Sequence, residues 1–252
     1  MIKLLLEKRA VVVGGAGRIG SAITQAFLRH GAQVLLVDRD EEALRRITEE
    51  LPAGERAHCY PCCLEMDHEG SADKLAKMVA ERLDWVDILV NCLGYIYRAP
   101  FTAHSMAEME KLMKLNFSVT FAVCQKIASM MVKRGSGKII NFSSVGGFRP
   151  EKEHSGYCAA KAALIALSRV MALELSPEHI QINVVAPGPT ETVPFRSPYY
   201  MEHPEALQAI EAVTGRIGHP EDHTGLVVFL ASDQSDWITG QVIASDGGWG
   251  LV

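Results

Sequence analysis

The stretch Ala10-Val11-Val12-Val13-Gly14-Gly15-Ala16-Gly17-Arg18-Ile19-Gly20 decides the fold of this 252-residue chain. Its first four residues form an apolar, mostly β-branched run that is typical of a buried strand. After the glycines, apolar residues recur at helical spacing, at Ala22, Ile23, Ala26, Phe27 and Leu28. Strand, glycine turn and helix are together the setting of a dinucleotide-binding loop, because glycine lets the backbone approach a pyrophosphate at a helix N-terminus. The alternative is a tight turn that needs glycine only for positive φ.

The same alternation of strand and helix continues along the chain. We expect further strands at Gln33–Val37, Arg56–Cys62, Ile88–Val90, Lys138–Phe142, Gln181–Ala186 and Gln241–Ser245. We expect helices at Glu41–Glu50, Gly70–Arg82, Met106–Asn116, Val119–Arg134, Tyr157–Leu175, Glu205–Val213 and Glu221–Ala231. Alternation of this kind predicts one α/β domain, a three-layer doubly wound parallel sheet that binds its ligands at the carboxyl ends of the strands. A proline-bearing segment at about 190–215 lies on that edge and predicts a lid.

Composition excludes several classes of protein. Hydrophobic residues make up 48% of the chain and the net charge is only −5, with no basic run that would indicate nucleic acid. The apolar runs fall short of the ~20 residues of a membrane span, so we expect no membrane partner. The six cysteines lack a disulfide framework, which favours a cytoplasmic protein. Cys59 and Cys62 have the spacing of half a zinc site, but no second half follows, and we expect no metal.

Tyr157 and Lys161 form a candidate acid–base pair. They are four residues apart in a segment that predicts a helix, so their side chains share one face. A phenol titrates near pKa ~10, and a neighbouring ammonium favours the phenolate and lowers that pKa. Such a pair can exchange a proton with a substrate. The alternative is an accidental pair on an amphipathic helix.

Asp38 bears on the choice of cofactor. It ends the second strand about 20 residues past the glycines, where a carboxylate can accept hydrogen bonds from ribose hydroxyls and would repel a 2′-phosphate. This position favours NAD over NADP. Two features weaken the argument: Asp38 and Glu41 also fit a helix capping box, and Arg18 and Arg39 can meet a 2′-phosphate.

In this order, the motifs resemble the short-chain dehydrogenase/reductase family over nearly the whole chain. Val13–Gly20 is similar to the family's Thr-Gly-x-x-x-Gly-x-Gly loop, with Val13 in place of Thr and Arg18 in place of the middle Gly. Asn91-Cys92-Leu93-Gly94 is similar to its Asn-Asn-Ala-Gly, and Pro187-Gly188 to its Pro-Gly turn. The family's active-site Asn, Ser, Tyr and Lys fall on Asn116, Ser144, Tyr157 and Lys161.

The resemblance implies an NAD(P)-dependent oxidoreductase that interconverts a secondary alcohol and a ketone. Tyr157 would exchange the hydroxyl proton, and Lys161 would lower the pKa of Tyr157 and hold the nicotinamide ribose. Ser144 would donate a hydrogen bond to the substrate oxygen, and Asn116 would anchor a water that links Lys161 to solvent. The implied cofactor contacts are Gly14, Gly17, Arg18, Ile19, Gly20, Asp38, Arg39, Glu65, Met66, Asn91, Gly94, Tyr157, Lys161, Pro187, Gly188, Thr190 and Thr192.

The segments after Gly94, Ser144 and Gly188 should form the substrate pocket. The candidate substrate residues are Tyr95, Arg98, Ser144, Arg149, His154 and Arg196. Arg149 and Arg196 can pair with an anionic group, so our hypothesis is a small polar hydroxy compound, namely a hydroxy acid, sugar acid or polyol. Three alternatives stay open: both arginines are surface or interface residues, the substrate is a hydrophobic ketone or 3-oxoacyl compound, or the protein is a non-catalytic nucleotide sensor. The resemblance also implies a homotetramer or homodimer.

Overall fold

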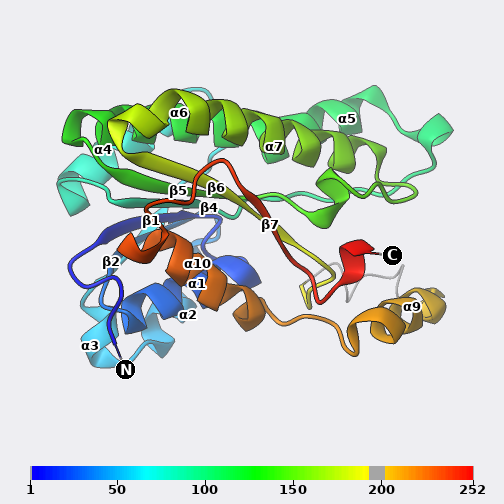
Figure 1. Cartoon of the computed structure of the whole chain (residues 1–252), viewed down its shortest axis with the longest axis horizontal. Helices are drawn as coiled ribbons and strands as arrows, with labels where there is room; N and C mark the ends of the chain where they lie inside the picture. Colours follow the sequence, from blue (N-terminus) through cyan, green and yellow to red (C-terminus); the bar gives the residue numbers. More distant parts are fainter. Residues whose placement is uncertain (1, 193–201, 252) are drawn as a thin grey trace.

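A parallel sheet forms the middle layer of the computed structural model, which describes residues 2–192 and 202–251 (Figure 1). Within those residues the sheet has the strand order β3-β2-β1-β4-β5-β6-β7. Its strands are β1 (Arg9–Val13), β2 (Gln33–Asp38), β3 (Cys59–Cys63), β4 (Ile88–Asn91), β5 (Gly137–Phe142), β6 (Ile180–Pro187) and β7 (Val242–Ser245). Strand β1 pairs with β2 on one side and β4 on the other, so the order reverses beside it. Sheets of this kind bind ligands at such a reversal.

Helices cover both faces of the sheet, as expected (Figure 1). One face carries α1 (Arg18–Arg29), α2 (Glu41–Glu50) and α10 (Thr224–Ala231), and the other carries α4 (Ser71–Leu83), α6 (Val119–Arg134) and α7 (Ser155–Leu175). Within the described residues, the remaining α-helices are α3 (Ala53–Arg56), α5 (Met106–Met113) and α9 (Pro204–Thr214). A π-helical turn η2 (Lys114–Ser118) joins α5 to α6. The 3₁₀ turns are η1 (Phe101–Ala103), η3 (Val145–Gly147), η4 (Ser176–Glu178), η6 (Pro220–His223), η7 (Asp233–Ser235) and η8 (Trp249–Leu251).

The β1 residues explain why their sequence shows no polar alternation. Successive side chains of a strand point to opposite faces of a sheet. Ala10 and Val12 therefore pack in the core beneath α1, and Val11 and Val13 pack in the core beneath α4 and α6. Both faces are buried, so every position of the strand is apolar.

Some predicted boundaries are wrong. The strand expected from Arg56 begins only at Cys59, because the chain from Pro52 first makes the helical turn α3. The helix expected from Glu221 begins with η6, and α10 follows from Thr224. The expected helices ending at Asn116 and starting at Val119 are one continuous helix, which bends through η2 rather than breaking.

That long helix also meets the length and composition expected of a membrane span, unlike the shorter apolar runs. Across Met106–Arg134 the most apolar 18-residue window has a mean hydropathy of 1.3. In this fold 44% of the window is buried, and α6 packs on the sheet beside α4. A core helix passes the same test, so this is weak evidence for a membrane-spanning segment.

Candidate active site

The glycine loop at the carboxyl end of β1 has the shape of a phosphate cradle. Gly14 has a φ of +75°, which favours glycine, and its N–H bonds to Val37 O at 3.0 Å. A Cβ on Gly20 would lie 2.3 Å from Gly14 O, so a side chain there would force the loop apart. The loop leads into α1, whose N-cap, Gly17, makes no side-chain capping bond. The first N–H groups of α1 therefore remain for an anion such as a pyrophosphate, and these residues fit the cofactor.

Asp38 lies beside this cradle, at the end of β2. Its Oδ2 accepts a hydrogen bond from Ala16 N at 2.9 Å, and its Oδ1 accepts from Arg39 N at 2.8 Å. Helix α2 is capped instead by Asp40, which accepts from Ala43 N at 2.9 Å. The capping-box interpretation of Asp38 is therefore wrong.

The two cations that weakened the NAD argument both have carboxylate partners. Arg18 Nη1 lies 3.6 Å from Glu191 Oε1, and Arg39 Nη1 lies 3.3 Å from Glu65 Oε1. Glu65, an expected adenine neighbour, thus holds Arg39, and Met66 packs partly buried against the core.

A cavity of about 700 Å³ opens at the same edge of the sheet. Its walls include Gly14, Gly17, Arg18, Ile19 and Gly20 from the cradle, and Ser144, Tyr157 and Lys161 from the expected catalytic set. Gly94, Pro187, Gly188, Thr190 and Thr192 also line it, as do Arg98, Arg149 and His154. The cofactor cradle and the acid–base pair therefore share one space.

Burial sets the proton affinities of the acid–base pair. It raises the pKa of Tyr157 to about 12, although a hydrogen bond with Ser144 acts in the opposite direction. It lowers the pKa of Lys161 to about 8, against a smaller opposing effect of Cys92. The pKa of Tyr157 therefore lies above its ordinary value and not below it as expected, because burial of the phenol outweighs any effect of the Lys161 ammonium.

Lys161 and Asn116 both approach Gly94. Lys161 is 2% exposed and donates hydrogen bonds to Leu93 O at 3.2 Å and to Phe142 O at 2.9 Å. Asn116 lies in η2, accepts from Tyr95 N and donates to the carbonyls of Tyr95 and Leu112. A Cβ on Gly94 would lie 3.8 Å from Asn116 Oδ1 and 3.9 Å from Lys161 Nζ. Both polar groups therefore lie within van der Waals reach of a β-carbon at this position.

Some expected site residues turn away from the cavity. Asn91 donates to Asn141 Oδ1 at 2.8 Å within the sheet layer. Tyr95 donates to Glu108 Oε2 at 3.0 Å, on α5. Thr190 lines the cavity, but its hydroxyl bonds Gly188 O at 2.9 Å and His223 Nε2 at 3.0 Å within the fold. Arg196 lies outside the described residues.

Other cavity residues were not expected from the sequence. They are mainly Ile96, Glu151, Lys152 and Trp249, together with Ala206, Ala209 and Ile210 of α9. Glu151 Oε2 lies 3.2 Å from His154 Nδ1, across the turn that precedes α7. This hydrogen bond is the largest cause that lowers the pKa of Glu151, and the nearby Arg98 acts in the same direction.

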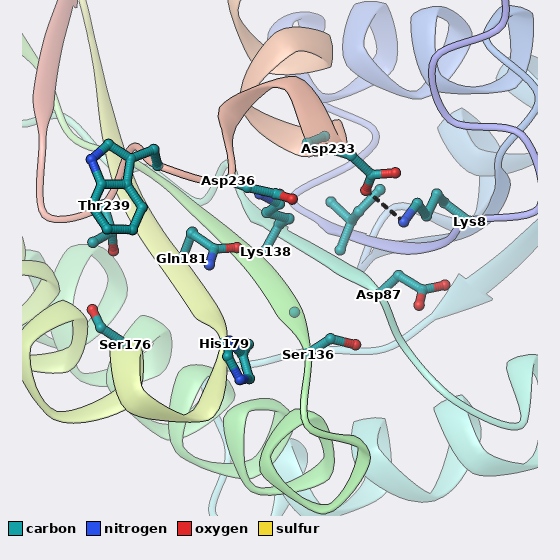
Figure 2. A pocket seen from close by; sticks show the side chains of 14 residues that line it. Lys8, Asp87, Ser136, Lys138, Ser176, His179, Gln181, Asp233, Asp236 and Thr239 are labelled. Atoms are coloured by element: carbon teal, nitrogen blue, oxygen red, sulfur yellow. Dashed lines mark hydrogen bonds and ion pairs between the residues drawn. The ribbon is translucent and has the colours of Figure 1, made fainter.

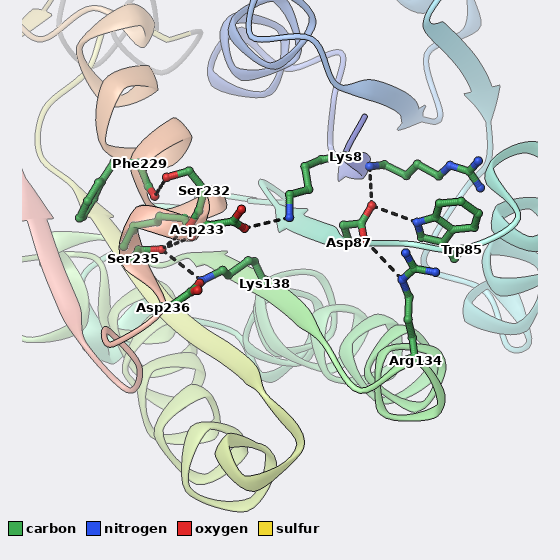
Figure 3. Close-up of polar contacts among 12 residues, drawn as sticks. Lys8, Trp85, Asp87, Arg134, Lys138, Phe229, Ser232, Asp233, Ser235 and Asp236 are labelled. Atoms are coloured by element: carbon green, nitrogen blue, oxygen red, sulfur yellow. Dashed lines mark hydrogen bonds and ion pairs between the residues drawn. The ribbon is translucent and has the colours of Figure 1, made fainter. Parts of the chain in front are cut away.

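A second cavity, of about 570 Å³, lies at the opposite edge, where β4, β5 and β6 begin (Figure 2). Its charged side chains neutralise one another: Lys8 pairs with Asp233 at 2.8 Å and Lys138 with Asp236 at 2.6 Å. Asp87 accepts from Trp85 Nε1 at 3.1 Å and lies 3.6 Å from Arg134 Nε (Figure 3). These contacts tie the segment after α10 to the starts of the strands, away from Tyr157.

A Tyr–Lys pair that shares a cavity with a glycine cradle on a doubly wound sheet defines an oxidoreductase that uses a nicotinamide dinucleotide. Comparison with known proteins agrees. A family model described as enoyl-(acyl carrier protein) reductase matches residues 14–250. The chain belongs to the short-chain dehydrogenase/reductase family, and it is an NAD(P)-dependent oxidoreductase.

Individual relatives extend over the whole chain. A rhamnolipids biosynthesis 3-oxoacyl-[acyl-carrier-protein] reductase of Pseudomonas aeruginosa is 35% identical over 98% of both proteins. A D-threitol dehydrogenase of Mycolicibacterium smegmatis is 30% identical over 96% of this chain and 92% of that protein. A gluconate 5-dehydrogenase of Burkholderia cenocepacia, solved with NADP and tartrate, has a TM-score of 0.90 at 28% identity, covering 99% of this chain and 98% of that one.

Proposed function

We propose that the protein interconverts a secondary alcohol and a ketone on a small polar hydroxy compound: a hydroxy acid, sugar acid or polyol. The observation that carries this proposal is the polar wall of the cavity that holds Tyr157. Arg98, Arg149, Glu151, Lys152 and His154 all line it. Charged and hydrogen-bonding walls favour substrates that carry several oxygen atoms. The D-threitol relative and the structure with bound tartrate support the same class.

The side chains supply the proton chemistry. Bound nicotinamide would give or take the hydride at the carbon. Tyr157, protonated at neutral pH, gives its proton to the carbonyl oxygen during reduction and takes it back during oxidation. Ser144 holds the same oxygen by a hydrogen bond as charge develops there. The ammonium of Lys161 supports the charge on the phenol oxygen, and Asn116 connects Lys161 with solvent through a water.

We also propose that NAD is preferred to NADP. Asp38 presents a carboxylate beside the glycine cradle, where it would bond the ribose hydroxyls and repel a 2′-phosphate. The pairing of Arg18 with Glu191 and of Arg39 with Glu65 reduces the attraction for that phosphate. Relatives solved with NADH and with NADP are both known, so the preference rests on these residues.

A hydrophobic ketone or 3-oxoacyl compound is the second candidate substrate. Ile96 and three residues of α9, Ala206, Ala209 and Ile210, give part of the cavity an apolar wall. The similar Pseudomonas aeruginosa protein is a 3-oxoacyl reductase. This candidate predicts that activity rises with the length of an apolar chain.

The proposal extends to the lid, the assembly and the compartment. Helix α9 lines the cavity, and this supports the segment at about 190–215 as a substrate lid, although residues 193–201 lie outside the described part of the chain. Exposed apolar residues on α6 and α7, namely Phe121, Val170 and Leu173, support a homotetramer or homodimer. Reduced cysteines support the cytoplasm.

A spectrophotometric screen tests the proposal. Alcohols, polyols, hydroxy acids and their ketones are offered with NAD(H) and NADP(H) in parallel, and cofactor absorbance is followed. We expect turnover of a polyol, sugar acid or hydroxy acid with NAD(H). Tight cofactor binding without turnover of any compound would favour the nucleotide-sensing alternative instead.

A further inference from the structure

His154 is a residue of the active-site cavity to which no role has yet been given, and the role inferred for it rests on the proposed function. His154 is 4% exposed and lines the cavity together with Tyr157 and Ser144. It is the N-cap residue of α7, three residues before Tyr157, so both rings lie on the same face of the helix start. The ring centres are 5.8 Å apart.

Among the described residues, one nitrogen of the His154 ring has a hydrogen-bond partner and the other has none. Nδ1 lies 3.2 Å from Glu151 Oε2, a carboxylate whose pKa is lowered, chiefly by its hydrogen bond with His154. Among the described residues, the buried Nε2 has no hydrogen-bond partner. Burying a polar atom without a partner costs free energy. Because His154 lines the cavity, a substrate group that reaches Nε2 would recover that free energy by supplying the bond.

The hydrogen-bond partner of Nδ1 determines whether Nε2 accepts or donates a hydrogen bond, and so which ligand group it can bind. A carboxylate accepts only, so the neutral ring keeps its proton on Nδ1. Nε2 then carries a lone pair and accepts a hydrogen bond. A hydroxyl group is the matching donor. The ring centres of His154 and Tyr157 lie 5.8 Å apart, so a hydroxyl that bonds Nε2 would lie near the group that reacts at Tyr157.

We propose that His154 is a specificity-determining residue that accepts a hydrogen bond from a second hydroxyl, vicinal to the reacting carbinol or carbonyl carbon of the substrate. Glu151 is its positioning residue, because it fixes the proton on Nδ1 and the orientation of the ring. The substrate class is thus narrowed to vicinal diols and α-hydroxyketones, including polyols and sugar acids.

Acetoin and butan-2-one test this directly, because they differ by one hydroxyl. We expect kcat/KM with NADH to be at least about tenfold higher for acetoin, since a site built to bond a hydroxyl rejects the analogue that lacks it. In His154→Phe the ratio should fall to near one, and His154→Gln, which restores an acceptor, should recover part of it. Glu151→Gln should lower the ratio to a lesser extent.

The matched control is His104→Phe. His104 also has a buried Nε2 without a partner in the described chain, but it packs edge-on against Tyr97 and does not line the cavity. Its variant should keep the wild-type ratio. Equal or better use of butan-2-one by the wild type, or a preserved ratio in His154→Phe, would overturn the inference.

A binding measurement separates this inference from the proposed reaction. If the wild type turns over neither ketone, the proposed function is decided by the screen of polyols, sugar acids and hydroxy acids, and the contact of His154 by binding. The contact of His154 is then measured by ¹⁵N NMR of histidine-labelled protein with NADH and acetoin. The His154 signal is the one that disappears in His154→Phe. A shift of the Nε2 resonance supports the hydroxyl contact, and an unchanged resonance contradicts it.

Discussion

The Nζ atom of Lys161 lies 5.8 Å from the centre of the Tyr157 ring and donates hydrogen bonds to the backbone carbonyls of Leu93 and Phe142. The ammonium is therefore positioned by the chain at the ends of β4 and β5. Lys161 is buried and Tyr157 is half-buried, and the pKa of each shifts toward the uncharged form. The proton exchange proposed for Tyr157 and the supporting charge proposed for Lys161 can be tested by changing one residue at a time.

Removing the Tyr157 hydroxyl should abolish most turnover. In Tyr157→Phe the ring keeps its packing, but no group remains to exchange the substrate proton, and a positioned acid–base contributes about 10²–10⁴-fold. We expect kcat to fall by at least that factor while the dissociation constant for NADH changes little. Steady-state kinetics and fluorescence titration check this, and unchanged turnover would remove Tyr157 from its role.

Lys161 should make stability depend on pH. Its pKa is lowered from 10.5 to about 8, so between these values the unfolded chain binds more protons than the folded one. Stability contributed through this group therefore rises with pH across that window. From pH 7 to pH 9, wild type should gain about 1 kcal/mol relative to Lys161→Met. Urea unfolding at both pH values measures this, and parallel profiles of the two proteins would contradict it.

Asp38 should control the cofactor preference. Asp38→Ala removes the carboxylate beside the cradle, and we expect the ratio of kcat/KM for NAD to that for NADP to fall at least about tenfold, since every ~1.4 kcal/mol is a factor of ten. Asp40→Ala is the control, because Asp40 only caps α2. That variant should lose about 1 kcal/mol of stability and keep the cofactor ratio. Equal ratios in Asp38→Ala and wild type would refute the assignment.

The cradle should tolerate no side chain at Gly20. A Cβ there would lie 2.3 Å from Gly14 O, a backbone atom, so the loop must move. Gly20→Ala should weaken NADH binding at least about tenfold, which corresponds to a loss of ~1.4 kcal/mol of binding free energy. Gly225→Ala in α10 meets nothing within 4 Å and serves as the control. Calorimetric titration compares them, and identical affinities would contradict the expected fit.

The layers of the fold could be predicted from the sequence because the signals are local. The apolar run Ala10–Val13 indicates a strand that is buried on both faces, and the alternation of strands and helices indicates a parallel sheet. The strand predicted from Arg56 failed because α3 is one short turn, set by Pro52 at its N-cap. A single turn leaves no periodic pattern to detect.

Site residues that belong to sequence motifs were predicted well. Residues that were assigned to the site only because they follow a motif in the chain were predicted less well. Ser144, Tyr157 and Lys161 line one cavity as expected. Tyr95 follows Gly94 in sequence, but its hydroxyl bonds Glu108, because the chain turns toward α5. The shared cavity of Trp249 and Tyr157 depends on how β7 ends, and no local pattern reports that position.

The π-helical turn has a consequence for chain length. In η2 the N–H of Val119 bonds to the carbonyl of Lys114, five residues back instead of four, so the helix holds one surplus residue at Asn116. Deleting one residue between 114 and 118 would restore an ordinary helix and rotate α5 by about 100° about the axis relative to α6. Asn116 would then swing away from Gly94. A change in length at this turn would therefore break the hydrogen bonds of Asn116 with the backbone of Tyr95 even if every named side chain were kept.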